Sequence, residues 1–140
     1  MSASIELLTR PGPIAEPSPG TLPDAAATQP GLRAPELTIV VPTFNETANI
    51  APLVERIAEA LVGIDWEVIF VDDDSPDGTA DTVGDVARGE PRVRCLQRLG
   101  RRGLSSACIE GMLASSAPYL AVMDADLQHD ERLLPKMIAM

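Results

Sequence analysis

Three short, mostly apolar runs constrain the fold of this chain more than any other feature of its sequence. They span residues 37–41 (LTIVV), 66–71 (WEVIFV) and 119–123 (YLAVM). A strand with one side in water alternates apolar and polar residues, whereas a strand covered on both faces is apolar almost throughout. The three runs therefore predict buried strands of a parallel sheet.

Helical patterns separate these runs. Apolar residues recur at helical spacing over residues 50–61, with Asn49 in position to cap that helix. Further helices are predicted over residues 77–88, 104–112 and 131–140, and a short strand over residues 93–96. This alternation predicts an α/β fold in which right-handed crossovers place helices on both faces of a parallel sheet.

The first 35 residues differ from the rest of the chain. They contain seven prolines and no sustained apolar period. Proline at this density interrupts both helices and strand ladders. We expect residues 1–35 to form a disordered Pro/Ala-rich leader and residues 36–140 to form the folded part, and a short helix at residues 5–8 has no further support.

Composition excludes several classes of function. A formal net charge of -10 argues against a nucleic-acid partner, and 3% aromatic residues leave few platforms for stacking on bases. Cys95 and Cys108 lack the spacing of a metal site, so we expect reduced thiols. No apolar run is long enough to cross a bilayer and no secretion signal is evident, which favours a cytoplasmic location.

Polar residues follow three of the predicted strands, in segments 42–46, 72–79 and 124–129. Doubly wound sheets bind their ligands beyond the carboxyl ends of the strands. If residues 124–128 continue the strand, its period of two directs Asp124, Asp126 and Gln128 to one side. Such an oxygen-rich set suits Mg²⁺ or Mn²⁺ with positions left open for a diphosphate. The pattern therefore indicates nucleotide-diphosphate chemistry. We expect His129 to be a neutral residue behind the ligands or at the surface, and not a metal ligand or a catalytic residue.

The segment PTFNE at residues 42–46 has two interpretations. Phe44 lies against a flat base while Glu46 hydrogen-bonds the base or the ribose. Alternatively, the segment is an ordinary turn with Phe44 in the core and Glu46 near the positive end of a helix dipole.

The segment DDDSPDGT at residues 72–79 brings like charges together, so a cationic or donor-rich partner is expected nearby. One of its carboxylates can accept the ring N–H of uracil or guanine; the alternative is that Asp74, Ser75 and Asp77 serve only as turn and cap residues. Arg98, Arg101 and Arg102 either approach phosphate oxygens or form a solvated basic loop.

Four motifs in order and spacing carry a resemblance to a known family. VPTFNE (residues 41–46), VDDDSPDGT (71–79), GLSSACIEGM (103–112) and MDADLQH (123–129) resemble the family 2 glycosyltransferases. Among these the chain is most similar to the polyprenyl-phosphate sugar transferases of the dolichol-phosphate mannosyltransferase type. The resemblance implies a Rossmann-like GT-A fold for nucleotide-diphospho-sugar transfer, truncated here because the family's catalytic domain continues well past the metal motif.

The resemblance also implies roles for individual residues. The nucleoside and diphosphate would be bound by Pro42, Phe44, Glu46, Asp72, Asp73 and Asp124. Within this set Asp73 would bind the base. Asp124 and Asp126 would be the catalytic residues, and the metal would be held by Asp126 and Gln128 with Asp124 beside them.

The implied activity is metal-dependent, inverting transfer of a hexose from a donor of the GDP-mannose or UDP-glucose type. The acceptor would be a dolichyl or undecaprenyl phosphate, and the full-length protein would be peripheral or tethered at the cytoplasmic membrane face through parts absent here. Two alternatives stay open. One is a non-catalytic nucleotide-binding fragment, and the other is a phosphatase of the haloacid dehalogenase type, which would have Thr or Val in place of Gln128.

Overall fold

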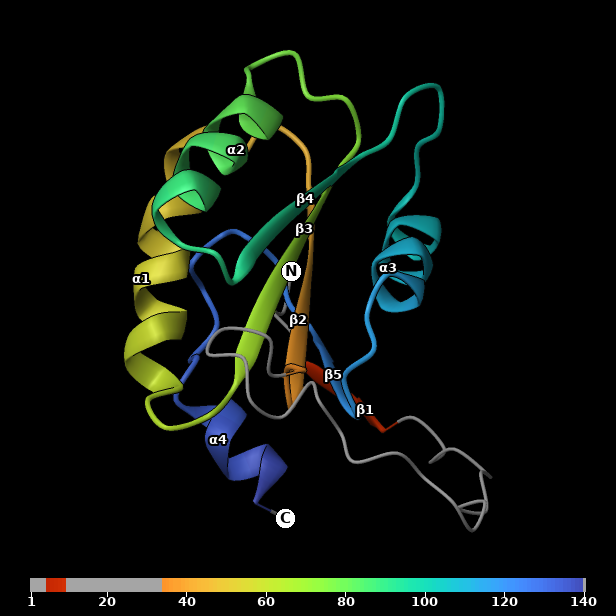
Figure 1. Ribbon diagram of the computed structural model, residues 1–140. Coiled ribbons are helices and arrows are strands. Elements are labelled where there is room, and N and C mark those ends of the chain that lie inside the picture. The colour runs from red at the N-terminus through yellow and green to blue at the C-terminus, as the bar shows by residue number, and fades with distance from the viewer. Residues whose placement is uncertain (1–4, 10–33, 140) are drawn as a thin grey trace, which may run out of the picture.

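A five-stranded sheet organises the chain in the computed structural model, which describes residues 5–9 and 34–139 (Figure 1). The strand order is β1-β5-β2-β3-β4. The strands are β1 (Glu6–Thr9), β2 (Leu37–Thr43), β3 (Trp66–Asp72), β4 (Val93–Gln97) and β5 (Tyr119–Val122). β2, β3, β4 and β5 are mutually parallel, and β1 pairs antiparallel with β5. The α/β fold with a parallel sheet is confirmed, with an antiparallel strand added at one edge.

Helices cover both faces of the sheet, as predicted. The helical elements are η2 (Thr47–Asn49), α1 (Ile50–Ala60), α2 (Thr79–Gly89), α3 (Leu104–Leu113) and α4 (Leu133–Ile138). Figure 1 shows α1 and α2 side by side on one face and α3 on the other. In the part of the chain that the structure describes, no helix is long and apolar enough to span a membrane.

The central strands contribute to two apolar clusters, one on each face. Ile39 and Val41 belong to the cluster that contains α1 and α2, while Val40 between them belongs to the cluster that contains α3. All three side chains are 0% exposed. Burial on both faces is the physical reason why β2 shows no alternation of apolar and polar residues.

The prediction of an unstructured leader is wrong for Glu6–Thr9, and so is the short helix at residues 5–8. These residues form β1, in which Leu7 stands opposite Ala121 of β5. The segment ELLT contains no proline, and the edge of β5 offers unpaired N–H and C=O groups with which it can pair. The rest of the predicted leader, residues 1–4 and 10–33, lies outside the described residues.

Some predicted boundaries and caps also differ. Asn49 does not cap α1 with its side chain; its Nδ2 donates to Glu46 Oε2 at 2.7 Å, and the short η2 turn precedes the helix. α2 begins at Thr79 instead of residue 77, because Asp77 Oδ1 accepts the Thr79 N–H at 3.0 Å ahead of the helix. α4 is shorter than the predicted 131–140.

Candidate functional site

The carboxyl ends of the four parallel strands lie along one edge of the sheet (Figure 1). The register pairs Thr43 at the end of β2 with Asp72 at the end of β3, and Asp72 with Gln97 at the end of β4. β5 lies on the other side of β2. β3 and β5 are therefore separated by two strand spacings, about 10 Å. The three polar segments that follow β2, β3 and β5 all leave the sheet at this edge.

The segments after β2 and β3 are bound directly to each other. The backbone N–H of Asn45 donates to Ser75 Oγ at 2.9 Å, and that of Glu46 donates to Thr79 Oγ1 at 3.0 Å. Asn45 has a positive φ of 55°, a conformation that Asn adopts more readily than most residues. Two motifs that are 30 residues apart in the sequence therefore form one continuous structure.

Asp72 is fully buried and stabilises the turn that follows β3. Its Oδ1 accepts the Thr43 hydroxyl at 3.1 Å and also the Ser75 hydroxyl, and its Oδ2 accepts the Ser75 N–H at 3.0 Å. These hydrogen bonds satisfy a buried carboxylate that would otherwise be costly. Direct contact of Asp72 with a nucleotide remains a prediction, whereas its role in the turn follows from its contacts.

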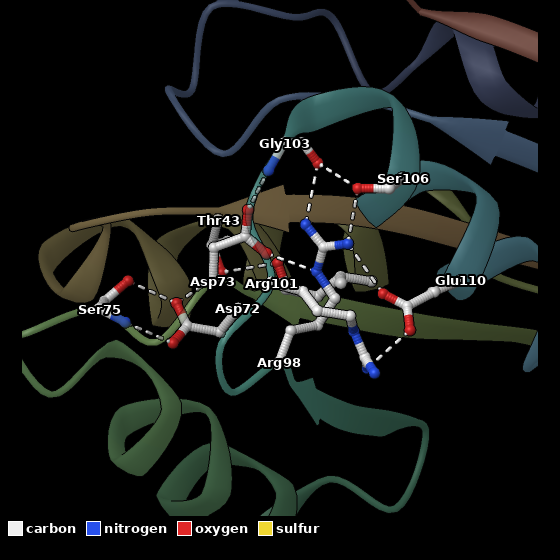
Figure 2. A network of polar contacts seen from close by, with 10 residues as sticks. Thr43, Asp72, Asp73, Ser75, Arg98, Arg101, Gly103, Ser106 and Glu110 are labelled. Atoms are coloured by element: carbon white, nitrogen blue, oxygen red, sulfur yellow. Dashed lines mark hydrogen bonds and ion pairs between the residues drawn. The ribbon is translucent and has the colours of Figure 1, made fainter.

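Asp73 belongs to a buried network centred on Arg98, shown in Figure 2. Arg98 Nε donates to Asp73 Oδ1 at 2.6 Å, and the N–H of Gly103 donates to Asp73 Oδ2 at 3.1 Å. The hydrogen bond from Arg98, helped by that from Gly103, holds the pKa of Asp73 below its ordinary value even though desolvation opposes this. Asp73 is therefore an ionised acceptor in a fixed orientation.

The same arginine reaches α3 (Figure 2). Arg98 Nη1 donates to Glu110 Oε2 and to Ser106 Oγ, both at 2.8 Å, and Nη2 donates to the carbonyl of Gly103 at 2.9 Å. The Arg98 side chain is 0% exposed. The hydrogen bond to Asp73, followed by that to Glu110, raises the pKa of Arg98 despite its burial. The expected cationic partner of the aspartate cluster is thus Arg98.

Both interpretations of the three arginines, an approach to phosphate oxygens and a solvated basic loop, are wrong for Arg98, whose guanidinium is buried and hydrogen-bonded to four groups of the protein. Arg101 Nη2 lies 2.7 Å from Glu110 Oε1, and the Arg102 guanidinium lies 5.3 Å from the centre of the Phe44 ring. Phe44 is 46% exposed. The interpretation of Phe44 as a core residue is therefore wrong, and the ring remains available at the sheet edge.

Asp74 and Asp77 match the turn and cap interpretation. Asp74 has a positive φ of 56° and accepts a hydrogen bond from Gln97 Nε2 at 3.3 Å. Asp77 accepts hydrogen bonds from the hydroxyl and N–H of Thr79, and the hydroxyl in particular lowers the pKa of Asp77. These two carboxylates connect the turn to β4 and to the start of α2.

The segment after β5 is a loop and not an extension of the strand. β5 ends at Val122, and Leu127 has a positive φ of 62°, so the period-two geometry expected for residues 124–128 is wrong. The alternation of exposure nevertheless holds in the loop. Within residues 124–129, Asp124, Asp126 and Gln128 are exposed, and Ala125 and His129 are buried.

His129 is buried and contacts the backbone of this loop. Its Nε2 accepts the backbone N–H of Asp124 at 3.3 Å and lies 3.7 Å from Asp124 Oδ2. Arg56 of α1 donates to the carbonyl of Leu127 at 3.0 Å from another side. A nearby pocket of about 480 Å³ lies between α1 and the loop and is lined in part by Gln128 and His129.

The exposed oxygens of the loop fit a hard divalent cation. Two carboxylates, Asp124 and Asp126, and the amide of Gln128 are of the type that Mg²⁺ and Mn²⁺ prefer. Asp126 Oδ1 accepts the Gln128 N–H at 3.2 Å, which brings these two residues together. Within the described residues no three His, Cys, Asp or Glu side chains form a metal cluster. Gln128, water and substrate phosphate would have to complete the coordination.

Sequence reasoning did not identify Glu110 as part of the site. Its carboxylate binds both Arg98 and Arg101. A signal was present, because Glu110 is the only charged residue in α3, whose sequence is otherwise LSSACI and GML. A lone acid in a helix of small and apolar residues indicates a specific cationic partner.

Comparison with known proteins gives a family match over most of the chain. The model of Glycosyl transferase family 2 matches residues 38–140. A dolichol-phosphate mannosyltransferase of Pyrococcus furiosus is 41% identical over 103 residues, which are 74% of this chain and 29% of that protein. The dolichol-phosphate mannosyltransferase of Saccharomyces cerevisiae is 39% identical over 105 residues, 73% of this chain and 39% of the relative.

A dodecaprenyl-phosphate galacturonate synthase of Rhizobium johnstonii is 37% identical over 107 residues, 74% of this chain and 32% of that protein. The chain thus spans between 29% and 39% of the length of these relatives. Among solved structures, the mannosyltransferase PcManGT of Pyrobaculum calidifontis, in complex with GDP-Man and Mn²⁺, superposes with a TM-score of 0.57. It is 27% identical, and the match covers 68% of this chain and 28% of that one.

The glucosyl-3-phosphoglycerate synthase of Mycobacterium tuberculosis, in complex with Mn²⁺ and UDP, has a TM-score of 0.59 at 23% identity, over 75% of this chain and 39% of that one. At this sequence identity, the structural similarity shows that the two proteins share a fold.

Proposed function

The chain belongs to glycosyl transferase family 2, and from this premise we propose that it contributes the donor-binding part of an enzyme that transfers a hexose from a nucleotide-diphosphate sugar to a polyprenyl phosphate. The phosphatase alternative does not agree with this family.

The observation that carries the proposal is the convergence of three polar segments at one sheet edge. The segments after β2 and β3 are hydrogen-bonded to each other. The loop after β5 leaves the same edge, next to β2 and two strand spacings, about 10 Å, from β3. An exposed aromatic ring and an ionised carboxylate, those of Phe44 and Asp73, follow β2 and β3. The exposed oxygens of Asp124, Asp126 and Gln128 follow β5, on the other side of β2 from β3. An elongated ligand with a base at one end and a diphosphate at the other suits this arrangement.

Residue roles follow from this placement. Phe44, with Pro42 and Glu46 in the same segment, would contact the nucleoside, and Asp73 would accept a ring N–H of the base. Asp124, Asp126 and Gln128 would orient the diphosphate through a bound Mg²⁺ or Mn²⁺. That cation supplies electrostatic stabilisation of the charge that develops on the departing diphosphate.

The acceptor chemistry places few demands on the protein. A phosphate monoester has a second pKa of about 6, so its oxygen is already anionic near neutral pH and needs no strong general base. Attack of that oxygen on the anomeric carbon forms one C–O bond as the bond to the diphosphate breaks. Attack from the face opposite the leaving group inverts the anomeric configuration.

The relatives support the lipid acceptor more than a particular donor. Their names include dolichol phosphate and dodecaprenyl phosphate, whereas the sugars named are mannose and galacturonate. We therefore propose a polyprenyl phosphate acceptor and a donor of the GDP-mannose or UDP-glucose type. Because such an acceptor resides in a membrane, the enzyme would work at the cytoplasmic membrane face, through parts of the protein beyond this chain.

A donor screen on the full-length protein tests the proposal. The protein is incubated with polyprenyl phosphate in vesicles, Mg²⁺ or Mn²⁺, and GDP-mannose, UDP-glucose or UDP-galacturonate in turn. Product mass identifies the transferred sugar, and NMR of the anomeric proton identifies the configuration. We expect one donor to give a glycosyl-phosphate lipid of inverted configuration, in a reaction that EDTA stops. Nucleotide binding by calorimetry without transfer from any donor would instead favour the non-catalytic alternative.

A further inference from the structure

Arg98 is the largest fully buried side chain of the described residues, and it is a charged one. Its guanidinium donates to four groups on three segments of the chain. These are Asp73 after β3, Gly103 in the loop before α3, and Ser106 and Glu110 within α3 (Figure 2). Because it is 0% exposed, Arg98 does not contact a ligand itself.

We propose that Arg98 is a positioning residue for the donor nucleotide, which acts by fixing the orientation of Asp73. This inference rests on the proposed function and deepens it. Asp73 directly follows β3 at the carboxyl edge of the sheet, and its side chain is 14% exposed. Glu110 is 29% exposed but lies within α3. The effect of Arg98 on the donor passes through Asp73, because Asp73 is the one of its partners that the proposed function assigns to the base.

The geometry leaves Asp73 a single function as an acceptor. Arg98 Nε binds one carboxylate oxygen and the Gly103 N–H binds the other. An ionised carboxylate has no proton to donate, so the lone pairs that remain can only accept. Held in this state, Asp73 suits a base with a ring N–H, such as guanine or uracil, and not the ring acceptor that adenine or cytosine presents.

Stability alone does not account for this arrangement. Buried ion pairs are often no more stable than well-packed apolar residues of similar volume, because desolvation offsets the attraction between the charges. A planar guanidinium, however, fixes several acceptors in defined directions at once, which a lysine ammonium does not do. Arg98→Lys therefore keeps the charge while it removes the fixed geometry.

The test compares steady-state kinetics of the full-length wild type and Arg98→Lys. We expect the KM for the donor to rise roughly 10- to 100-fold, as for the loss of hydrogen bonds between charged groups. The kcat and the KM for the acceptor should change less than about 3-fold, because the groups at the diphosphate end are untouched. In the double variant with Asp73→Asn, the rise in donor KM should not exceed that of Asp73→Asn alone, since both changes act through one carboxylate.

Arg94→Lys is the matched control. Arg94 lies in β4, the strand that ends one residue before Arg98. It binds Glu67 of β3 at 3.0 and 3.1 Å, and it donates to the carbonyl of Ala114 just after α3 at 2.9 Å. Like Arg98, Arg94 connects this part of the chain to β3 and to α3, but it does so away from the carboxyl ends of the strands. We expect its donor KM to stay within about 2-fold of wild type, because no contact of Asp73 changes.

An unchanged donor KM in Arg98→Lys, or an equal rise in both arginine variants, would overturn the inference. If Arg98→Lys does not fold, Ser106→Ala removes one hydrogen-bond partner of Arg98 and keeps the charge of the arginine. The KM for the donor is then expected to rise roughly 3-fold, and an unchanged KM would contradict the inference. If the wild type transfers no sugar, the proposed function fails separately. The dissociation constants of GDP and UDP, measured by calorimetry, then replace KM, and the absence of any nucleotide binding overturns the inference as well.

Discussion

At the scale of single residues, four aspartates close together in the sequence have four different surroundings. Asp72 is enclosed by hydroxyl and N–H donors, Asp73 is paired with Arg98, and Asp74 accepts from a glutamine. Asp77 accepts from the first residue of α2. Because each carboxylate has its own donors, the mutual repulsion expected from the sequence is offset locally, and Asp73 alone is oriented by a buried cation.

The first prediction concerns the loop after β5. Asp126→Ala should lower kcat of the full-length enzyme by about 100-fold or more, because a group that stabilises developing charge is worth that much in other enzymes. Asp130→Ala is the control: Asp130 is exposed in the same loop and binds Arg132 at 2.8 Å. Steady-state assays measure kcat of both variants and of the wild type, and circular dichroism checks that the variants are folded. Unchanged turnover in Asp126→Ala would remove this residue from the site.

The second prediction concerns acid stability. The pKa of Asp73 lies below its ordinary value of about 3.9 because Arg98 binds the ionised form. The stabilisation is therefore complete above about pH 4 and is lost as the pH falls through the lower pKa of the folded state. Urea unfolding from pH 6 to pH 2.5 measures this effect. The free energy of unfolding of the wild type should exceed that of Asp73→Asn by a constant amount down to about pH 4, and by a smaller amount below pH 4. A gap of the same size at every pH contradicts the pairing.

At the scale of elements, α3 packs directly against the sheet at Gly111. Gly111 faces β2 and β3, and a Cβ added there would overlap the Val40 side chain and lie 3.0 Å from Val71 Cγ2. The absence of a side chain at this position therefore allows the helix to approach the sheet. This approach also holds the start of α3 near Arg98, which binds two of its residues.

A pair of glycine substitutions tests this packing. Gly111→Ala should destabilise the protein by about 1–3 kcal/mol through overpacking, although alanine is the better helix former. Gly84→Ala in α2 has nothing within 4 Å of the added methyl group. That variant should instead stabilise the protein by roughly 0.5–1 kcal/mol. Urea midpoints measure both effects, and equal shifts in the two variants would contradict close packing of α3.

At the scale of the whole molecule, β1 completes the sheet beside β5. It joins the amino-terminal residues to the strand that leads into the Asp124 loop, and Leu7 packs against the main apolar cluster. Without β1, the edge of β5 would present unpaired backbone groups, which favour association with other chains.

Deletion of residues 1–9 should therefore promote self-association. Size-exclusion chromatography over a range of concentrations should show oligomers or aggregates that wild type does not form. Leu8→Asn is the control, because Leu8 is 39% exposed and the change leaves the strand backbone in place. A deletion variant that elutes as wild type does would show that β1 does not protect this edge.

The sequence by itself determined the four parallel strands, the helices between them and the three polar segments at one sheet edge. These features depend on local patterns: apolar runs such as residues 37–41 reveal burial on both faces, and parallel strands necessarily end at the same edge. Family membership followed from the same motifs, because their order and spacing are properties of the sequence.

Only the tertiary structure decided how polar groups pair. Local sequence indicates a cationic partner for the aspartate segment and for Glu110, but it does not show that one buried guanidinium, that of Arg98, binds both acids. Likewise, Glu6–Thr9 becomes a strand because β5 offers it an edge, and Asn49 donates to Glu46 instead of capping α1. The physical reason is that a side chain or strand edge takes whichever partner the assembled fold brings within hydrogen-bond distance, and that choice depends on residues far away along the chain.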